Sequence, residues 1–186
     1  MPSTIRSFIA ARIPCTPPLR PILRELRDMG NAIKSTDPDE LHLTLKFLGD
    51  IRWEQTAEIA KRLKSVAAGI PQFTTMLQGI GAFPDAARPN VVWAGVESKR
   101  SFERLASDLE DQLAELGFLP EARNFHPHIT LARIKAAVPR GLSEWISGLS
   151  QRDFGSADLK EIELFQSELA SAGPSYTSLA TARLGR

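Results

Sequence analysis

The chain has 186 residues, of which 42% are hydrophobic and 24% are charged, a composition typical of a soluble globular protein with a sizeable core. Its 23 basic and 22 acidic residues leave a net charge of +1, which excludes a protein that grips long nucleic acid or a membrane through a large basic surface. The single cysteine, Cys15, excludes an internal disulfide and any site that needs several thiolates. No apolar run approaches the ~18 residues that span a bilayer, so we expect a cytoplasmic protein. From the length we expect one domain over residues 1–186, and we take the protein to be a monomer.

Strand and helix patterns alternate through the first half of the chain. Alternating or continuous apolar residues predict strands at 5–13, 41–48 and 72–77, the last of which continues loosely toward Phe83. Apolar residues at helical spacing predict helices at 19–29 and 56–67, each followed by a glycine that can end a helix.

After a polar turn at 84–89 the order of elements starts again. The pattern predicts strands at 91–96, 126–132 and 159–166 and helices at 102–116 and 139–149. Each half therefore reads as β-α-β-α-β, with one extra strand at 175–183. The intervals from Ile5 to His42 and from Val91 to His128 are both 37 residues. We expect an α+β fold in which two half-repeats, approximately 5–83 and 90–168, are related by a pseudo-twofold axis.

Two of the three histidines share the same surroundings. The motifs His42-x-Thr44 and His128-x-Thr130 both place a threonine two residues after a histidine, inside a predicted strand. With ten threonines among 186 residues, chance would produce this coincidence with a probability of roughly 1% or less. The twin motif is therefore the strongest functional signal in the chain.

The spacing of the motif has a direct chemical meaning. Residues i and i+2 of a strand point to the same side, so each motif presents an imidazole beside a hydroxyl. If the two halves face each other, a phosphate fits between them. One imidazole can then take a proton from a nucleophile while the other gives a proton to the leaving oxygen. The hydroxyls of Thr44 and Thr130 can bind the non-bridging oxygens.

The charge pattern around the second motif also favours a phosphate. Residues 122–143 contain no acid but four basic residues: Arg123, Arg133, Lys135 and Arg140. In the first half, strict alternation would place Lys46 on the side of the motif and turn Phe47 toward the core. The same alternation would place Arg133 on the side opposite to His128, so that it reaches a phosphate only if the strand ends or twists there.

These motifs and their flanking residues resemble a known family. The segments HLTLKFLG at 42–49 and FHPHITLAR at 125–133 are similar to motifs of the bacterial and archaeal RNA 2′,3′-cyclic phosphodiesterases. This family is also called the 2′-5′ RNA ligase or LigT/ThpR family and lies within the 2H phosphoesterase superfamily. The segments RSFIA at 6–10 and VVWAGV at 91–96 look like the same family, so the resemblance covers nearly the whole chain.

The resemblance implies a bilobal α+β fold with antiparallel sheets lining a central cleft. It implies hydrolysis of 2′,3′-cyclic phosphates, on RNA ends or small nucleotides, to 2′-phosphates without a metal or cofactor, and a weak, reversible 2′-5′ ligation. The family's catalytic pair falls on His42 and His128, its phosphate-binding hydroxyls on Thr44 and Thr130, and its basic residue on Arg133. We take His42 as the general acid and His128 as the general base, although the symmetric motifs do not distinguish them.

Two other functions stay open at the level of the sequence. His126 could join His42 and His128 in a three-histidine zinc site, although such a site would leave the two threonines unexplained. Alternatively, the fold could bind RNA ends without turning them over. Four aromatic residues are candidates for stacking on a nucleobase: Phe8, Phe47, Phe125 and Trp53.

Overall fold

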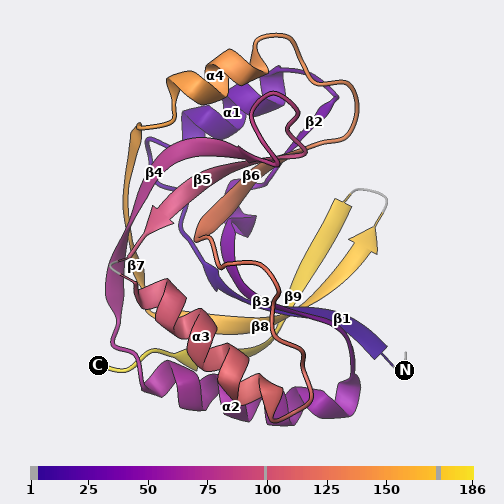
Figure 1. Cartoon of the computed structure of the whole chain (residues 1–186), viewed down its shortest axis with the longest axis vertical. Helices are drawn as coiled ribbons and strands as arrows, with labels where there is room; N and C mark the ends of the chain where they lie inside the picture. The colour runs from indigo at the N-terminus through magenta and orange to yellow at the C-terminus, as the bar shows by residue number, and fades with distance from the viewer. Residues whose placement is uncertain (1–3, 99, 171–172) are drawn as a thin grey trace.

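The computed structural model describes residues 4–98, 100–170 and 173–186 and folds them into two antiparallel sheets (Figure 1). The four-stranded sheet has the order β3-β1-β8-β9, formed by β1 (Thr4–Arg12), β3 (His42–Arg52), β8 (Glu161–Ala170) and β9 (Gly173–Arg183). The five-stranded sheet has the order β2-β6-β5-β4-β7, formed by β2 (Ile33–Ser35), β4 (Phe73–Phe83), β5 (Val91–Glu97), β6 (His128–Ile134) and β7 (Asp153–Leu159). The predicted α+β class with antiparallel sheets is confirmed.

Helices cover one face of each sheet. The helices are α1 (Arg20–Asp28), α2 (Thr56–Ala68), α3 (Ser101–Ala114) and α4 (Leu142–Gly148), with short 3-10 helices η1 (Pro38–Glu40) and η2 (Trp53–Gln55) at the two ends of β3. Figure 1 shows α1 and α4 above the five-stranded sheet and α2 and α3 below the four-stranded one. The uncovered inner faces of the two sheets look toward each other, and β3 lies against β6. None of the helices in the described ranges has the length and apolarity that crossing a membrane requires.

The helices pack because each carries one apolar stripe. In α3, for example, four large side chains at helical spacing are completely buried: Phe102, Leu105, Leu109 and Leu113. Burying a side chain of this size contributes about 1.5–3 kcal/mol. Gly30 and Gly117 follow α1 and α3 with φ of 109° and 86°. This is the left-handed conformation that a glycine adopts where a helix ends, and the sequence predicts both helix ends at these glycines.

Both sheets take strands from both halves of the chain. The first half contributes β1 and β3 to the four-stranded sheet and β2 and β4 to the five-stranded one, while the second half contributes β5, β6 and β7 to the five-stranded sheet and β8 to the four-stranded one. Backbone ladders therefore tie the two halves together and position β3 relative to β6. The division of the chain into half-repeats at 5–83 and 90–168 stays a prediction.

Two strands are absent from the sequence prediction. The strand β2 has only three residues, which is too short for a period-2 pattern to be seen. In β7 the alternation is interrupted by Gly155, whose φ of 86° lies in the left-handed region, and by the polar residues around it. Neither segment carries a residue of the predicted site.

Candidate active site

The first motif lies on β3, directly before a β-bulge. The cross-strand partners on β1 are Arg12 for His42, Ala10 for Thr44 and Phe8 for Phe47. Ala10 and Phe8 are two residues apart on β1, whereas their partners Thr44 and Phe47 are three residues apart on β3. The register therefore leaves Leu45 as an extra residue without a partner on β1. His42, Thr44 and Phe47 therefore share the inner face of the sheet, and Phe47 is 64% exposed there.

The bulge overturns two expectations from strict alternation. Phe47 does not enter the core, and Lys46 does not join His42 on the inner face. Instead the ammonium of Lys46 turns to the helix-covered face, where it donates to Glu110 Oε2 of α3 at 2.6 Å and to the carbonyl oxygen of Leu119 at 3.0 Å. The Lys46 side chain is only 2% exposed, so this cation holds β3 to α3 and is unavailable to a phosphate.

The strand β6 repeats this arrangement after the second motif. The cross-strand partners on β5 are Gly95 for His128, Trp93 for Thr130 and Val91 for Arg133. Leu131 is the extra residue, and both Leu131 and Ala132 are fully buried. Arg133 consequently lies on the same side as His128 and Thr130, whereas strict alternation places it on the opposite side. The bulge supplies the local twist that brings this guanidinium to the inner face.

The ring of His42 is anchored by the backbone just before it. Its Nδ1 lies 2.7 Å from the carbonyl oxygen of Glu40. Since a carbonyl only accepts, Nδ1 carries the hydrogen and Nε2 is the nitrogen that can exchange a proton in the site. Burial lowers the pKa of His42 from its usual 6.5, while the contact with Glu40 acts against this shift. The positive charges of Arg12, Arg133 and His128 lower the pKa further.

His128 has the same anchor in the other sheet. Its Nδ1 lies 2.6 Å from the carbonyl oxygen of His126, which again leaves Nε2 for proton exchange. Burial lowers the pKa of His128, the contact with the His126 carbonyl opposes the shift, and the charges of the His126 ring and Arg133 lower it further. Both imidazoles therefore favour the neutral form, and an anion bound between them would favour protonation of one.

Arg133 links the two strands electrostatically. Its charge acts to lower the pKa of His42 on β3, of His128 on β6 and of Tyr176 on β9, so it lies near all three groups. Burial outweighs this effect for Tyr176, whose pKa is raised. A guanidinium near two imidazoles is suited to neutralising a bound phosphate. The sequence gives no sign of Tyr176, which reaches the site only through the pairing of β9 with β8.

Aromatic rings surround His42 on the inner face. The ring centroid of His42 lies 5.3 Å from that of Phe8 and 5.0 Å from that of Tyr176, which meets it edge-on. Phe8 is in turn 6.3 Å from Phe47 and 5.3 Å from Phe165. We call Phe8, Phe47, Phe165 and Tyr176 the aromatic cluster. Of the other two predicted stacking residues, Phe125 packs against the core and Trp53 lies beyond the far end of β3.

His128 is bordered by a different set of rings. Its centroid lies 5.0 Å from Phe83, 6.2 Å from Trp93 and 5.9 Å from His126. The three-histidine zinc alternative needs the rings of His126, His128 and His42 to converge on one point. Within the described residues, no three His, Cys, Asp or Glu side chains come together in a way that could hold a metal ion. The geometry therefore gives that alternative no support.

Comparison with known proteins finds the same architecture. The model of the 2′-5′ RNA ligase superfamily matches residues 16–169. The RNA 2′,3′-cyclic phosphodiesterase of Archaeoglobus fulgidus is 35% identical over 161 residues, which cover 87% of this chain and 89% of the relative. The Thermus thermophilus protein TT0787 superposes with a TM-score of 0.81 at 32% identity, over 98% of this chain and 100% of that one. E. coli LigT complexed with 3′-AMP superposes with a TM-score of 0.73 at 28% identity, over 98% and 99% of the two chains.

These similarities extend over the whole architecture and are not confined to the motifs. The matched range of the superfamily model contains both histidine motifs and both bulged strands. The solved structures share the arrangement of two antiparallel sheets over nearly their full length. The chain therefore belongs to the 2′-5′ RNA ligase superfamily, as a member of its RNA 2′,3′-cyclic phosphodiesterase (LigT) family.

Proposed function

We propose that this protein opens the 2′,3′-cyclic phosphate at the end of an RNA or on a small nucleotide and leaves a 2′-phosphate. The observation that carries the proposal is the pair of imidazoles, His42 and His128, each anchored through Nδ1 to a backbone carbonyl and both near the charge of Arg133. Two such groups can hold opposite protonation states around one phosphorus, which is what general acid–base catalysis requires.

In the proposed reaction, a water molecule attacks phosphorus on the side opposite to the 3′-oxygen. Neutral His128 accepts the water proton at Nε2 as the new P–O bond forms, and protonated His42 donates its proton to the 3′-oxygen as the P–O3′ bond breaks. The hydroxyls of Thr44 and Thr130 and the guanidinium of Arg133 hold the non-bridging oxygens, which stabilises the negative charge in the transition state. The atoms of one water molecule account for the whole change, and the phosphate stays on the 2′-oxygen.

The aromatic cluster supports a nucleoside beside His42. Phe47 exposes its ring on the inner face, and Phe8 lies behind it at 6.3 Å. A nucleobase of any identity can stack on such rings. The related E. coli LigT has been solved with 3′-AMP, which supports a site of this family that accepts a purine nucleotide. We therefore place the base of the cyclic nucleotide against Phe47.

The same groups can also run a ligation. If the 5′-hydroxyl of a second RNA replaces water, His128 removes its proton and a 2′-5′ phosphodiester forms as the P–O3′ bond breaks. Because no energy source drives this step beyond the cyclic phosphate itself, the ligation is weak and reversible. Hydrolysis prevails in water, whose concentration far exceeds that of RNA ends.

Product analysis tests the proposed function. Adenosine 2′,3′-cyclic phosphate is incubated with the purified protein in the presence of a chelator, and phosphorus NMR identifies the product. We expect the 2′-phosphate alone, and the same assay on tRNA halves, short RNA and ADP-ribose cyclic phosphate ranks the candidate substrates. Formation of the 3′-phosphate would contradict the proposed orientation, and loss of turnover that zinc restores would favour a metallohydrolase.

A further inference from the structure

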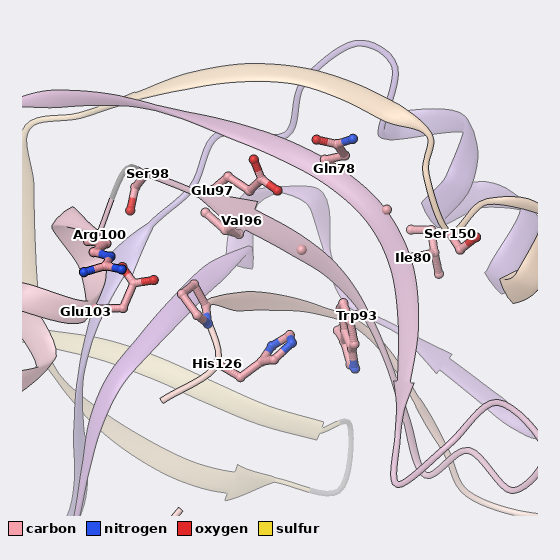
Figure 2. A pocket seen from close by; sticks show the side chains of 13 residues that line it. Gln78, Ile80, Trp93, Val96, Glu97, Ser98, Arg100, Glu103, His126 and Ser150 are labelled. Carbon is pink, nitrogen blue, oxygen red and sulfur yellow. The ribbon is translucent and has the colours of Figure 1, made fainter. Parts of the chain in front are cut away.

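A cavity of about 430 Å³ lies on the inner face of the five-stranded sheet and is bordered by His126 and Pro127, which directly precede His128 (Figure 2). Its volume lies in the range of small-molecule sites. The side chains that line it include Gln78, Trp93, Glu97, Glu103, His126 and Ser150. The catalytic mechanism proposed above uses none of them.

The cavity belongs to the His128 side of the site. The ring of His126 lies on its border, 5.9 Å from the ring of His128, and the carbonyl of His126 anchors that ring. Trp93 lies next to His126, with ring centroids 4.8 Å apart, as Figure 2 also shows. Of the described residues, no member of the aromatic cluster around His42 lines the cavity. The cavity therefore lies on the His128 side of the site and outside the aromatic cluster around His42.

The floor of the cavity is built around the indole of Trp93. Its ring lies so close over Gly81 that a Cβ at that position would overlap it, and a Cβ added at Gly95 would lie 3.8 Å from the ring. The indole Nε1 is buried and finds no acceptor among the described residues. A buried donor without a partner is costly, and an acceptor atom of a ligand would reach it only if the floor of the cavity shifts as the ligand binds.

The charges of the cavity disfavour a second phosphate. Among the described residues that line it, Glu97 and Glu103 contribute two carboxylates and Arg100 contributes one guanidinium. Carboxylates accept hydrogen bonds from sugar hydroxyls and from the N–H groups of bases, whereas they repel an anion. The walls thus suit an uncharged nucleoside.

From this arrangement we infer that the cavity binds the second nucleoside of the 2′-5′ reaction, the one that carries the 5′-oxygen. The inference rests on the proposed function. In an in-line displacement the 3′-oxygen and the 5′-oxygen lie on opposite sides of phosphorus, and one imidazole serves each. The nucleoside with the cyclic phosphate lies beside His42 and the aromatic cluster, so the other nucleoside lies beside His128, where the cavity is.

The reverse reaction isolates this site, because it needs both nucleosides and no water. In a 2′-5′-linked dinucleotide the 3′-hydroxyl loses its proton to His42, and its oxygen bonds to phosphorus. The P–O5′ bond breaks as protonated His128 gives its proton to the 5′-oxygen. The products are a 2′,3′-cyclic nucleotide and a nucleoside with a free 5′-hydroxyl. Hydrolysis of a cyclic mononucleotide, in contrast, leaves the cavity empty of nucleoside.

The test compares two substrates on the same protein: 2′-5′-linked diadenosine monophosphate and adenosine 2′,3′-cyclic phosphate. The variant Gln78→Trp fills the cavity from an exposed position on β4, and Thr74→Trp adds the same side chain at an exposed β4 position outside it. We expect Gln78→Trp to lower kcat/KM for dinucleotide cleavage at least tenfold and for hydrolysis less than twofold, and Thr74→Trp to change neither. Phe47→Leu, on the opposite side, should lower both reactions by a similar factor.

A second variant tests the inference without added bulk. Trp93→Phe keeps a ring over Gly81 but removes the Nε1 donor, and we expect a three- to tenfold loss in dinucleotide cleavage alone. The inference is overturned if the wild-type protein hydrolyses the cyclic nucleotide but does not cleave the dinucleotide, or if Gln78→Trp and Trp93→Phe affect both reactions equally or neither. Absence of hydrolysis by the wild-type protein would instead contradict the proposed function itself.

Discussion

The strands β3 and β6 carry the same motif in the same backbone geometry and differ in the side chain that the bulge turns to the inner face. Each has a histidine anchored through Nδ1, a threonine two residues later and a bulge at the next residue. The bulge turns the third residue after the threonine to the inner face, and this residue is Phe47 on β3 but Arg133 on β6. Under the proposed function, both strands share the acid–base chemistry and the threonine hydroxyls, while β3 adds a ring for the nucleobase and β6 adds a guanidinium for the phosphate.

The residues around the two histidines also differ between the two strands. His42 lies among the rings of the aromatic cluster, whereas His128 lies beside Trp93 and a cavity with carboxylates in its walls. Only the first environment resembles a platform for a base next to the phosphate. Changes at matched positions of the two strands can therefore separate what they share from what each does alone.

The largest effect should come from the shared groups. His42→Ala and His128→Ala should each lower kcat for cyclic phosphate hydrolysis by roughly 10²–10⁴, because each imidazole transfers a different proton. His126→Ala is the matched control and should cost less than tenfold, since only its backbone carbonyl anchors His128. Steady-state kinetics with circular dichroism as a check of folding decides the matter. Normal turnover in either histidine variant would contradict the two-histidine mechanism, whereas absence of turnover in the wild-type protein would favour an RNA-end binding module.

Arg133→Met should produce the next largest loss, about 10²–10³ in kcat/KM, as expected when one donor to a charged transition state is removed. Arg123→Met, at an exposed position in the same basic stretch, should change kcat/KM less than twofold. If both variants behaved alike, the four basic residues would act as a diffuse field, and the bulge of β6 would have no role in placing Arg133.

The two threonines offer a test of symmetry. Thr44→Val and Thr130→Val should each lower kcat by about tenfold, since each loses one hydrogen bond to the phosphate and keeps its shape. Thr44→Ser and Thr130→Ser keep the hydroxyl and should recover most of the rate. Measured values that differ by more than tenfold between the two strands would show that the phosphate is held mainly by one of them.

The sequence was sufficient to predict the family, the α+β class and the four helices, because these depend on long periodic patterns and a paired motif. The sequence was not sufficient where an extra residue in a bulge changes the face of the sheet to which the following side chains point. The apolar pair Leu131-Ala132 is a visible sign of the bulge in β6, but in β3 the buried Lys46 and the exposed Phe47 invert the usual polarity. Tyr176 could not be predicted either, since its place beside His42 depends on non-local strand pairing.

The smallest expected effect is a shift of the pH profile, which follows from the lowered pKa values of the two imidazoles. The free enzyme must hold one imidazole neutral and one protonated, so kcat/KM should be bell-shaped with two apparent pKa values that belong to the pair. Burial first, and then nearby positive charge, lowers the pKa of both His42 and His128 from the usual 6.5. The maximum should therefore lie below pH 6.5, because the acid loses its proton as the pH rises through the lowered values.

Removing the charge of Arg133 should reverse part of this shift. Arg133→Met takes away a cation that lowers the pKa of both imidazoles, so both limbs of the bell should move to higher pH, by less than one unit for partly solvated groups. Thr130→Val, which removes a hydrogen bond but no charge, should leave the limbs in place. Histidine proton resonances titrated by NMR would give the direction independently of the rate. A movement to lower pH, or no movement, would mean that the charge of Arg133 does not act on the two imidazoles, and the contrast between β3 and β6 would lose its electrostatic basis.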